Sequence, residues 1–487
     1  MQKKLKLKKV FKRPSFLLAL ILLLACLLRL YRITNPVADW HAFRQADTAS
    51  VTREYVKAAH IDLLRPQYQD LSNIQSGLDN LSGYRMVEFP FVNAALALIL
   101  RTFPSLDLVI LSRLASVFIS LLTILVLYQL VKEISGRKIA LLSALIYTVL
   151  PYSIYYSRVI LPEPYFVFFS TYSIWQFYLF AKNKKNSNYV GALLGLALAA
   201  LLKPFVVFLA PVYLAIIWQF RHHKIFSDPR VYLLPILAFA PLLFWREWIK
   251  NFPTGIPASK WLFNGNGIRL RPAWFRWLFY ERLTKLFLGY FGLIFLFANL
   301  CKKDRSFYFY GAWWLSVILY FVIIASGNVQ HDYYQNFMLP IVAISIARGL
   351  NIFYEQLKLK LNQKLTLIII FLISFLGLFF AWRQVSGYFN VNHWEYVTAG
   401  AAVDQLVDPK ALVIAPAMGD TQFLFQTNRR GWPIGFDIED KIAKGASIYV
   451  SVDYDWEAKA LEEKYQVIAK TDDYIIINLQ SLTNKKP

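Results

Sequence analysis

The stretch FLLALILLLACLLRLYRI, from Phe16 to Ile33, decides the class of the fold. A helix needs about 20 apolar residues to cross a bilayer, within a range of roughly 17–25. Seven Lys/Arg residues precede the run, and Arg29 and Arg32 lie near its end without an A-x-A pattern. A cleaved signal peptide would have a shorter apolar core and a small-residue cleavage site. We therefore predict an uncleaved first span that follows a basic cytoplasmic N-terminus, residues 1–15.

The composition of the whole chain predicts a polytopic membrane protein. Of its 487 residues, 57% are hydrophobic and 17% aromatic, which is too apolar for a soluble protein of this size. The net charge is +23, but the tail from Arg383 onward holds 11 Lys/Arg and 14 Asp/Glu. The basic surplus therefore lies in short clusters between apolar runs, as the positive-inside rule describes. We predict a plasma (inner) membrane protein, and nucleic acid is excluded as a partner.

A dense polar segment, DWHAFRQADTASVTRE, follows the first span from Asp39 to Glu54. We assign it to a long external first loop, residues 34–105, in which Thr48 to Leu64 is expected as a juxtamembrane helix. The run FVNAALALIL at the end of this loop is only about half as long as a span. If it crossed the membrane, the later basic loops would lie outside, opposite to the basic N-terminus. We therefore predict that it is interfacial or re-entrant.

The remaining apolar runs predict about eleven transmembrane helices, within a membrane domain of residues 16–382. An odd number of crossings places the C-terminus outside. The segment from Tyr189 to Phe220 is too long for one crossing, so we predict a hairpin that turns at Lys203-Pro204. After the first span, the predicted spans are Leu106–Val131, Ile139–Tyr156, Tyr165–Ala181, Tyr189–Leu202, Phe205–Phe220, Tyr232–Ile249, Leu283–Leu300, Phe307–Ser326, Phe337–Phe353 and Leu365–Trp382.

Residues 383–487 have the composition of a small extracytoplasmic α/β domain. Helices are expected at His393–Leu406, between the first two strands, and at Trp456–Lys464, and strands at Ala411–Ala415, Ala446–Val452, Gln466–Ala469 and Tyr474–Asn478. No G-x-G-x-x-G and no P-loop is present, so no nucleotide site is predicted.

No metal site and no cofactor is predicted from the sequence. The two cysteines, Cys26 and Cys301, lie in or beside distant apolar runs and indicate no disulfide framework. The DYD triplet, Asp453 to Asp455, resembles a metal-binding D-x-D but stands at a strand end, so we interpret it as structural.

Ionisable and polar side chains gather on the predicted outer side, at the ends of several spans. Such groups are costly at membrane depth and mark function. Each also has a structural alternative: Asp39 as a solvated cap, Arg158 and Glu163 as a pair across a turn, Lys203 as a snorkelling side chain. Their joint occurrence on one side favours a site. The candidates are Asp39, His41, Arg44, Gln45, Asp47, Glu88, Arg158, Glu163, Lys203, His331, Tyr333 and Tyr334.

Chemistry at the outer face has no nucleotide pool, so a sugar donor there must be lipid-linked. A lipid phosphate would explain why cations such as Lys203 and Arg158 stand beside acids.

The order of motifs resembles the GT-C-fold glycosyltransferases. The motifs are ADWHAFRQADTAS in the first loop, EFP before a short helix, PEPYFVFF, LLKP in the hairpin, and HDYY before a late span. The nearest branch looks like the bacterial relatives of the protein O-mannosyltransferases and of the lipid A aminoarabinose transferase. The resemblance covers about Lys9 to Trp382. The C-terminal domain matches nothing to which we can assign a function.

The resemblance implies sugar transfer from a polyprenyl-phosphate donor to a glycan, lipid or protein acceptor, often without a metal. It also implies an acid in the first loop as general base, a role that falls on Asp39. Asp47 is the rival, because the family's commoner pair of adjacent acids is absent: Asp39 is followed by Trp40. Lys203 and Arg158 would stabilise the leaving phosphate, and His331 and Tyr334 would bind phosphate or sugar.

Two other functions stay open at this stage. A flippase for a lipid-linked glycan would place its ionisable groups near the midplane and would often show paired repeats, and this chain shows neither. An outer-face ligase that moves a whole glycan is the other alternative.

Overall fold

The computed structural model describes residues 14–221 and 228–483. The basic residues before Pro14 and most of the RHHK loop, which entered the prediction of orientation, lie outside the described residues. The chain forms two compact units. The first comprises residues 1–33, 114–245 and 259–387, and the second comprises residues 34–113, 246–258 and 388–487.

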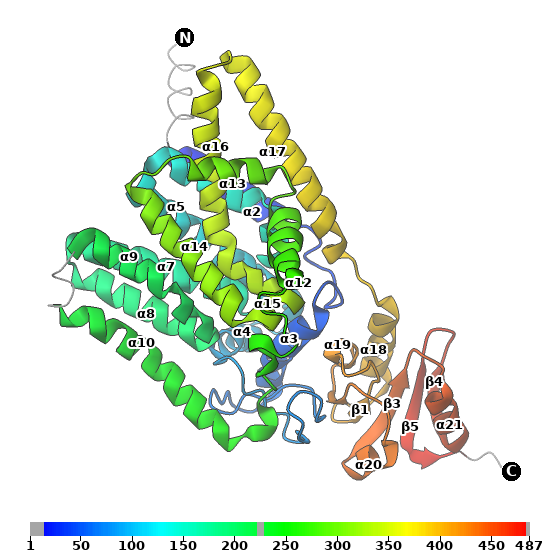
Figure 1. Ribbon diagram of the computed structural model, residues 1–487. Helices are drawn as coiled ribbons and strands as arrows, with labels where there is room; N and C mark the ends of the chain where they lie inside the picture. Colours follow the sequence, from blue (N-terminus) through cyan, green and yellow to red (C-terminus); the bar gives the residue numbers. More distant parts are fainter. Residues whose placement is uncertain (1–13, 222–227, 484–487) are drawn as a thin grey trace. The chain divides into compact units, whose positions relative to one another are not determined.

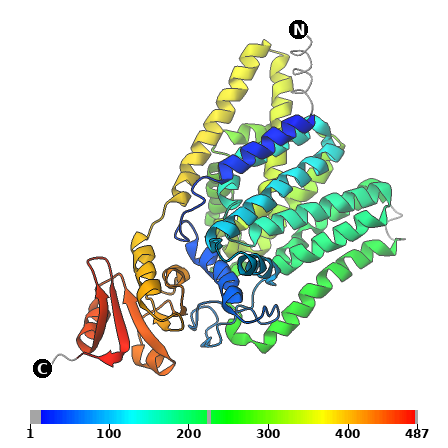
Figure 2. The ribbon, with the colours of Figure 1, turned by 180° about the vertical axis from the view of Figure 1, so that it is seen from behind.

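The first unit is helical, as Figures 1 and 2 show from two sides. Some of its elements begin or end beyond its bounds. They are α2 (Pro14–Arg29), α5 (Leu108–Val149), α6 (Pro151–Tyr156), α7 (Glu163–Asn183), α8 (Asn186–Leu202), η1 (Pro204–Leu209), α9 (Ala210–Arg221), α10 (Pro229–Trp248), α11 (Trp261–Asn264), α12 (Pro272–Phe275), η5 (Arg276–Phe287), α13 (Gly292–Leu300), α14 (Arg305–Ile323), α15 (Ala325–Gln330), η6 (Asp332–Met338), α16 (Leu339–Lys358) and α17 (Gln363–Val385).

The element α5 covers most of the predicted span Leu106–Val131 and the first part of the predicted span Ile139–Tyr156. Gly136, with φ 83° and ψ 171°, has a backbone that is not helical and divides the 42 residues into two limbs. Glycine adopts this conformation because it has no Cβ. The first limb corresponds to the predicted span Leu106–Val131. The predicted span Ile139–Tyr156 is divided, because the second limb ends at Val149 and Pro151 opens α6.

The predicted break at Lys203-Pro204 is confirmed. Helix α8 ends at Leu202, and Lys203 is extended, with φ −147° and ψ 118°. Pro204 then opens the 3₁₀ helix η1, since proline fits the first position of a helix, where no N–H bond is needed. Lys203 therefore stands between two helices.

The count of about eleven spans is not confirmed. Among the described residues, five helices are long and apolar enough to cross a membrane, or six if one bent pair is a single span. The bent pair corrects the predicted straight span Leu283–Leu300. The π-helix η5, with α12 before it, meets α13 at 114°. Several other predicted spans are shorter apolar helices, among them α2 and α8.

The second unit combines the first loop with the C-terminal α/β fold. The helix predicted at Thr48–Leu64 lies instead at Ala42–Lys57 (α3), so Arg44, Gln45 and Asp47 are helical. The short apolar run forms α4 (Phe91–Thr102), which at about 1.5 Å per residue spans about 18 Å and is shorter than a bilayer core. Two short 3₁₀ helices, η3 (Ile249–Asn251) and η4 (Pro253–Gly255), belong to the same unit.

The C-terminal part contains one five-stranded sheet of order β2-β1-β3-β5-β4 (Figure 2). Strand β1 pairs in parallel with β2 and β3, and β5 pairs antiparallel with β3 and β4. The elements β2 and α20 were not predicted, since both are short. The bounds are α18 (Trp394–Leu406), β1 (Leu412–Ile414), α19 (Thr421–Gln426), β2 (Arg430–Trp432), α20 (Ile438–Ala443), β3 (Ala446–Ser451), α21 (Trp456–Lys464), β4 (Tyr465–Lys470) and β5 (Ile475–Leu482).

The first loop extends this sheet. Asp70 forms a parallel bridge with Gly431, Leu71 N donates to Gly431 O at 2.8 Å, and Gly431 N donates to Gln69 O at 2.9 Å. The Leu71 side chain belongs to the same buried cluster as Ile414 and Trp432. The C-terminal fold therefore completes its core with residues that lie more than 300 positions earlier.

Close backbone packing joins α13 and α16 in the first unit. Gly349 of α16 is buried, and a Cβ at this position would collide with the backbone carbonyl of Phe295 in α13. Small residues of this kind let helices approach closely where lipid gives no hydrophobic driving force.

We predict that Gly349→Ala destabilises the protein by about 1–3 kcal/mol or more, because the clash is with backbone and must displace a helix. Thermal unfolding in detergent should show a lower melting temperature. Gly311→Ala in α14 is the matched control, since its Cβ would meet no atom within 4 Å. Equal stability of the two variants would contradict the packing described here.

Candidate active site

The start of α3 presents the polar residues of the first loop. His41 precedes the helix in a left-handed conformation, with φ 55° and ψ 36°. Asp39 and Trp40 lie just before it, while Arg44, Gln45 and Asp47 lie on the first two turns. The sequence placed these side chains in a loop, but the helix gives them fixed relative directions.

Asp39 has a fully buried carboxylate with a different donor at each oxygen. Gln45 Nε2 donates to Oδ1 at 2.7 Å, and it also donates to the Trp40 carbonyl at 3.1 Å. The Arg113 guanidinium lies 3.3 Å from Oδ2. Arg113 donates as well to the carbonyls of Asn35 and Pro36. The two partners fix the orientation of the carboxylate, and Arg113 balances its charge.

Sequence reasoning missed Arg113, because it lies within an apolar run that was taken as a span. The signal was available: a fully buried arginine in an apolar helix needs an anionic or carbonyl partner. Gln45 was predicted as a site residue, and its contact with Asp39 is a new finding of the structure.

Asp47 also has partners at both carboxylate oxygens. Its Oδ1 accepts from Thr421 Oγ1 at 2.7 Å, and Oδ2 accepts from Gln75 Nε2 at 3.0 Å. Arg85 lies 3.0 Å from Oδ2 as well. Since Thr421 opens α19 and Gln75 and Arg85 belong to the first loop, Asp47 ties three segments of the second unit together.

Two further acids lie near Asp47. Burial raises the pKa of Asp70 to about 6, and the charge of Asp47 adds to this rise. Burial also raises the pKa of Asp420, again with a contribution from Asp47. Asp70 accepts hydrogen bonds from Ser72 N at 2.8 Å and Tyr68 OH at 3.3 Å. These contacts indicate a structural role for this acidic group.

The remaining predicted residues of the second unit make contacts around the first turn of α3. Arg44 and Glu88 form an ion pair in which both side chains are largely buried. The Trp40 ring stacks on Tyr388, with centroids 4.9 Å apart, and the His41 ring lies 5.0 Å from that of Trp40.

In the first unit, the break at Lys203 brings a cation to the start of α7. Lys203 Nζ lies 3.1 Å from Glu163 Oε1, and both side chains are at most 10% exposed. The ammonium also lies 5.6 Å from the Tyr334 ring centroid. No described residue donates a hydrogen bond of good geometry to either oxygen of Glu163. The pair is therefore held chiefly by charge.

The HDYY motif contributes a second buried carboxylate. Asp332 Oδ1 accepts a hydrogen bond from Tyr156 OH, and the Asp332 carbonyl accepts one from Tyr152 OH at 2.7 Å. Arg282 of η5 lies 3.6 Å from Asp332 Oδ2. Arg282 was not predicted; it stands directly before the predicted span Leu283–Leu300.

The other predicted residues of the first unit are held by ring contacts and by a hydrogen bond to the backbone. His331 stacks on Tyr333 with centroids 5.2 Å apart, and Tyr334 lies against both rings. Arg158 is fully buried, donates to the Arg32 carbonyl at 3.0 Å, and lies over the Tyr155 ring. The alternative pairing of Glu163 with Arg158 is replaced by the pair with Lys203.

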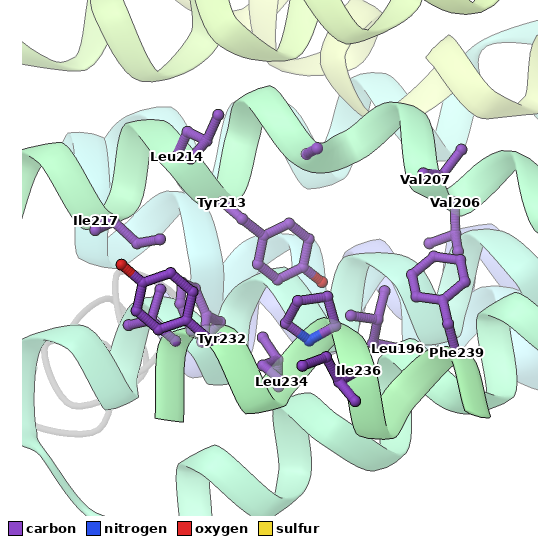
Figure 3. Close-up of a pocket in the computed structure, with 14 residues that line it drawn as sticks. Leu196, Val206, Val207, Tyr213, Leu214, Ile217, Tyr232, Leu234, Ile236 and Phe239 are labelled. Atoms are coloured by element: carbon purple, nitrogen blue, oxygen red, sulfur yellow. The ribbon is translucent and has the colours of Figure 1, made fainter. Parts of the chain in front are cut away.

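An apolar cavity of about 500 Å³ lies among α7, α8, η1, α9 and α10. Figure 3 shows Tyr213 and Ile217 of α9 and Tyr232 and Phe239 of α10 along it. Its wall includes Val206, three residues after Lys203. An elongated apolar ligand would fit such a lining.

Each unit thus holds its own part of the predicted set. The residues from Asp39 to Glu88 belong to the second unit, and Arg158, Glu163, Lys203, His331, Tyr333 and Tyr334 belong to the first. That the two groups serve one site stays a prediction. Across the described ranges, no three His, Cys, Asp or Glu side chains are grouped as a metal ion would require.

Comparison with known proteins confirms the expected resemblance. The family model described as dolichyl-phosphate-mannose-protein mannosyltransferase matches residues 89–245. No curated protein matches the chain.

Solved structures match over nearly the whole chain. ArnT from Cupriavidus metallidurans bound to undecaprenyl phosphate is 12% identical, with a TM-score of 0.66, over 94% of this chain and 97% of that one. The oligosaccharyltransferase from Archaeoglobus fulgidus in complex with zinc and sulfate is 11% identical, with a TM-score of 0.57, over 89% of this chain and 67% of that one. At these identities the comparison establishes a shared GT-C fold.

We predict that Asp47→Asn lowers the free energy of unfolding by about 1–3 kcal/mol, because Arg85 loses its buried anion. Limited proteolysis should show loosening of both the first loop and the C-terminal fold. Asp404→Asn is the control, since its partner Arg429 is also buried but Asp404 is 45% exposed, which should make its loss smaller. An Asp47→Asn protein as stable as the parent would contradict this structural role.

Proposed function

We propose that this protein transfers a sugar from a polyprenyl-phosphate-linked donor to a glycan, lipid or protein acceptor at the outer face of the membrane. Two comparisons support the donor class. The matching family description names a dolichyl-phosphate sugar, and the ArnT structure carries undecaprenyl phosphate. The distribution of basic loops supports the outer face.

The observation that carries the proposal is the Asp39 carboxylate, which Gln45 and Arg113 hold from two sides. A general base must be held in a fixed orientation, and these two partners supply that condition. Asp39 is only 3% exposed. Transfer therefore requires that substrate binding opens access to this carboxylate.

Asp47 is the weaker candidate for the base. Both acids have partners at both oxygens, but Thr421, a partner of Asp47, comes from the C-terminal fold, while Gln75 and Arg85 come from the first loop. A base at this position would have to break three contacts that join separate segments. We therefore assign the base to Asp39 and a structural role to Asp47.

Lys203 is the proposed cation for the leaving lipid phosphate. Negative charge develops on the phosphate as the glycosidic bond breaks, and a fixed ammonium stabilises it. Glu163 balances Lys203 while no phosphate is bound, and a phosphate with a higher charge would compete for the ammonium. Arg158, His331, Tyr333 and Tyr334 are assigned to phosphate and sugar binding, and Arg282 is added by the structure.

The apolar cavity suits the isoprenoid chain of the donor. Its wall begins at Val206, so a ligand whose phosphate meets Lys203 can place its tail there without leaving the first unit. Burying each methylene of the tail contributes about 0.8 kcal/mol.

We predict that Asp39→Asn lowers kcat at least about 100-fold while donor binding is retained, because only proton removal is lost. The measurement is sugar transfer by purified protein, followed by mass spectrometry of the product. Transfer at the parent rate in Asp39→Asn, together with its loss in a folded Asp47→Asn protein, would move the base to Asp47. Transport of lipid-linked glycan without any transfer product would instead support the flippase alternative.

We predict that Lys203→Ala destabilises the protein by about 3–5 kcal/mol, since Glu163 is left as an unpaired buried charge. The double variant Lys203→Met with Glu163→Gln should recover most of that stability and still raise the donor KM at least about tenfold, because the cation is missing. Lys138→Met with Glu355→Gln removes an exposed pair of the same kind and serves as the control. A parent-like donor KM in the Lys203 double variant would refute the assignment.

A further inference from the structure

A polar pocket of about 300 Å³ lies at the far end of α3 in the second unit. Its lining includes Glu54, His60, Asp62, Gln67 and Tyr84. None of these residues takes part in the proposed reaction. Glu54 comes ten residues after Arg44 on the same helix, about 15 Å along the axis, so the pocket is separate from the Asp39 group.

Glu54 supplies unused hydrogen-bonding capacity to this pocket. Its side chain is 12% exposed, and among the described residues its Oε1 has no hydrogen-bond partner. The nearest cation, Arg53 Nε, lies 4.0 Å away, beyond hydrogen-bond distance. Because Oε1 is buried, the exposed part of this carboxylate is what can accept a hydrogen bond from a ligand hydroxyl in the pocket.

The lining of the pocket carries no surplus of positive charge. Asp62 pairs with Arg65 at 2.7 Å and accepts from Leu64 N at 3.0 Å. Glu54 interacts with cations outside the lining, Arg53, Lys57 and Arg430. Within the lining two carboxylates, Glu54 and Asp62, stand beside one arginine, Arg65, so a phosphate or a nucleotide finds no match there. A neutral polar ligand fits better.

An aromatic ring completes the lining. Tyr84 is half-buried, and its ring packs edge to face against Phe252, with centroids 5.0 Å apart. An aromatic face beside hydroxyl-binding groups suits a sugar ring, which has an apolar face and a polar rim. The volume lies at the low end for small-molecule sites and suits one or two sugar rings.

We propose that this pocket is a carbohydrate-binding subsite for neutral sugars. Its role as a subsite for the acceptor rests on the proposed function, whereas sugar binding itself does not. Under that role the acceptor is a glycan, and the pocket holds a sugar unit remote from the reacting hydroxyl.

The test uses the full chain in lipid nanodiscs and saturation-transfer NMR with neutral methyl hexosides and disaccharides. At least one of these sugars should bind to the parent protein. Ala59→Trp, which fills the pocket from an exposed position, should abolish binding. Glu54→Gln should raise Kd about tenfold, which corresponds to one charge-assisted hydrogen bond. In the transfer assay, both variants should raise the acceptor KM more than they lower kcat.

Matched controls separate the pocket from general effects. Ala443→Trp places the same ring at another exposed alanine of the second unit, and Glu439→Gln removes a carboxylate that is 70% exposed. Both should bind sugar like the parent. If no sugar binds to the parent protein, or if Ala59→Trp binds sugar as well as the parent does, the proposed subsite is refuted. This holds even where the protein transfers sugar. Pocket-dependent binding without transfer from any polyprenyl-phosphate donor supports the subsite and refutes the proposed function.

Discussion

A charge in apolar surroundings must have an opposite charge or several hydrogen bonds as partners, and this constraint organises both units. Arg29, fully buried in the first helix, donates to Ser153 Oγ at 2.9 Å and to the carbonyls of Tyr147 and Thr148. The pairs Asp39–Arg113 and Glu163–Lys203 meet the same requirement. Each fixes the position of a helix end, because the cost of an unpaired buried charge exceeds that of bending the backbone.

The same requirement separates two aspartates that look equivalent in the sequence. Asp39 and Asp47 lie eight residues apart, and both are buried. The partners of Asp39 are Gln45, six positions away along the chain, and Arg113, 74 positions away, and they orient its carboxylate. Those of Asp47 come from distant segments and hold the first loop to the C-terminal fold. Its contact with the C-terminal fold gives Asp47 a structural role, and the base is proposed at Asp39, whose carboxylate is oriented by Gln45 and Arg113.

Much of the helical arrangement could be predicted from hydropathy and from the positions of helix-breaking residues such as proline. The break at Lys203-Pro204 follows from proline, and helix α21 lies at the predicted residues. The bend between η5 and α13 could not be read in this way, because its residues are as apolar as those of a straight span. Gly289 and Tyr290 have positive φ there, a backbone state that depends on packing. The predicted number of spans is not confirmed for a related reason: hydropathy gives the length of an apolar run but not of its helix.

By itself, the sequence determined the membrane class, the resemblance to GT-C enzymes and the candidate residues, because apolar runs, charge asymmetry and motif order are linear properties. Only the tertiary structure decided which residues become partners. Arg113 stood in a run assigned to the membrane and Arg282 directly before another, and Thr421 lies 374 positions after Asp47, with which it pairs. Such pairings depend on distances in space, to which separation along the chain gives no guide. The grouping of Glu54, Asp62 and Tyr84 around one polar pocket was likewise set by the fold of the first loop.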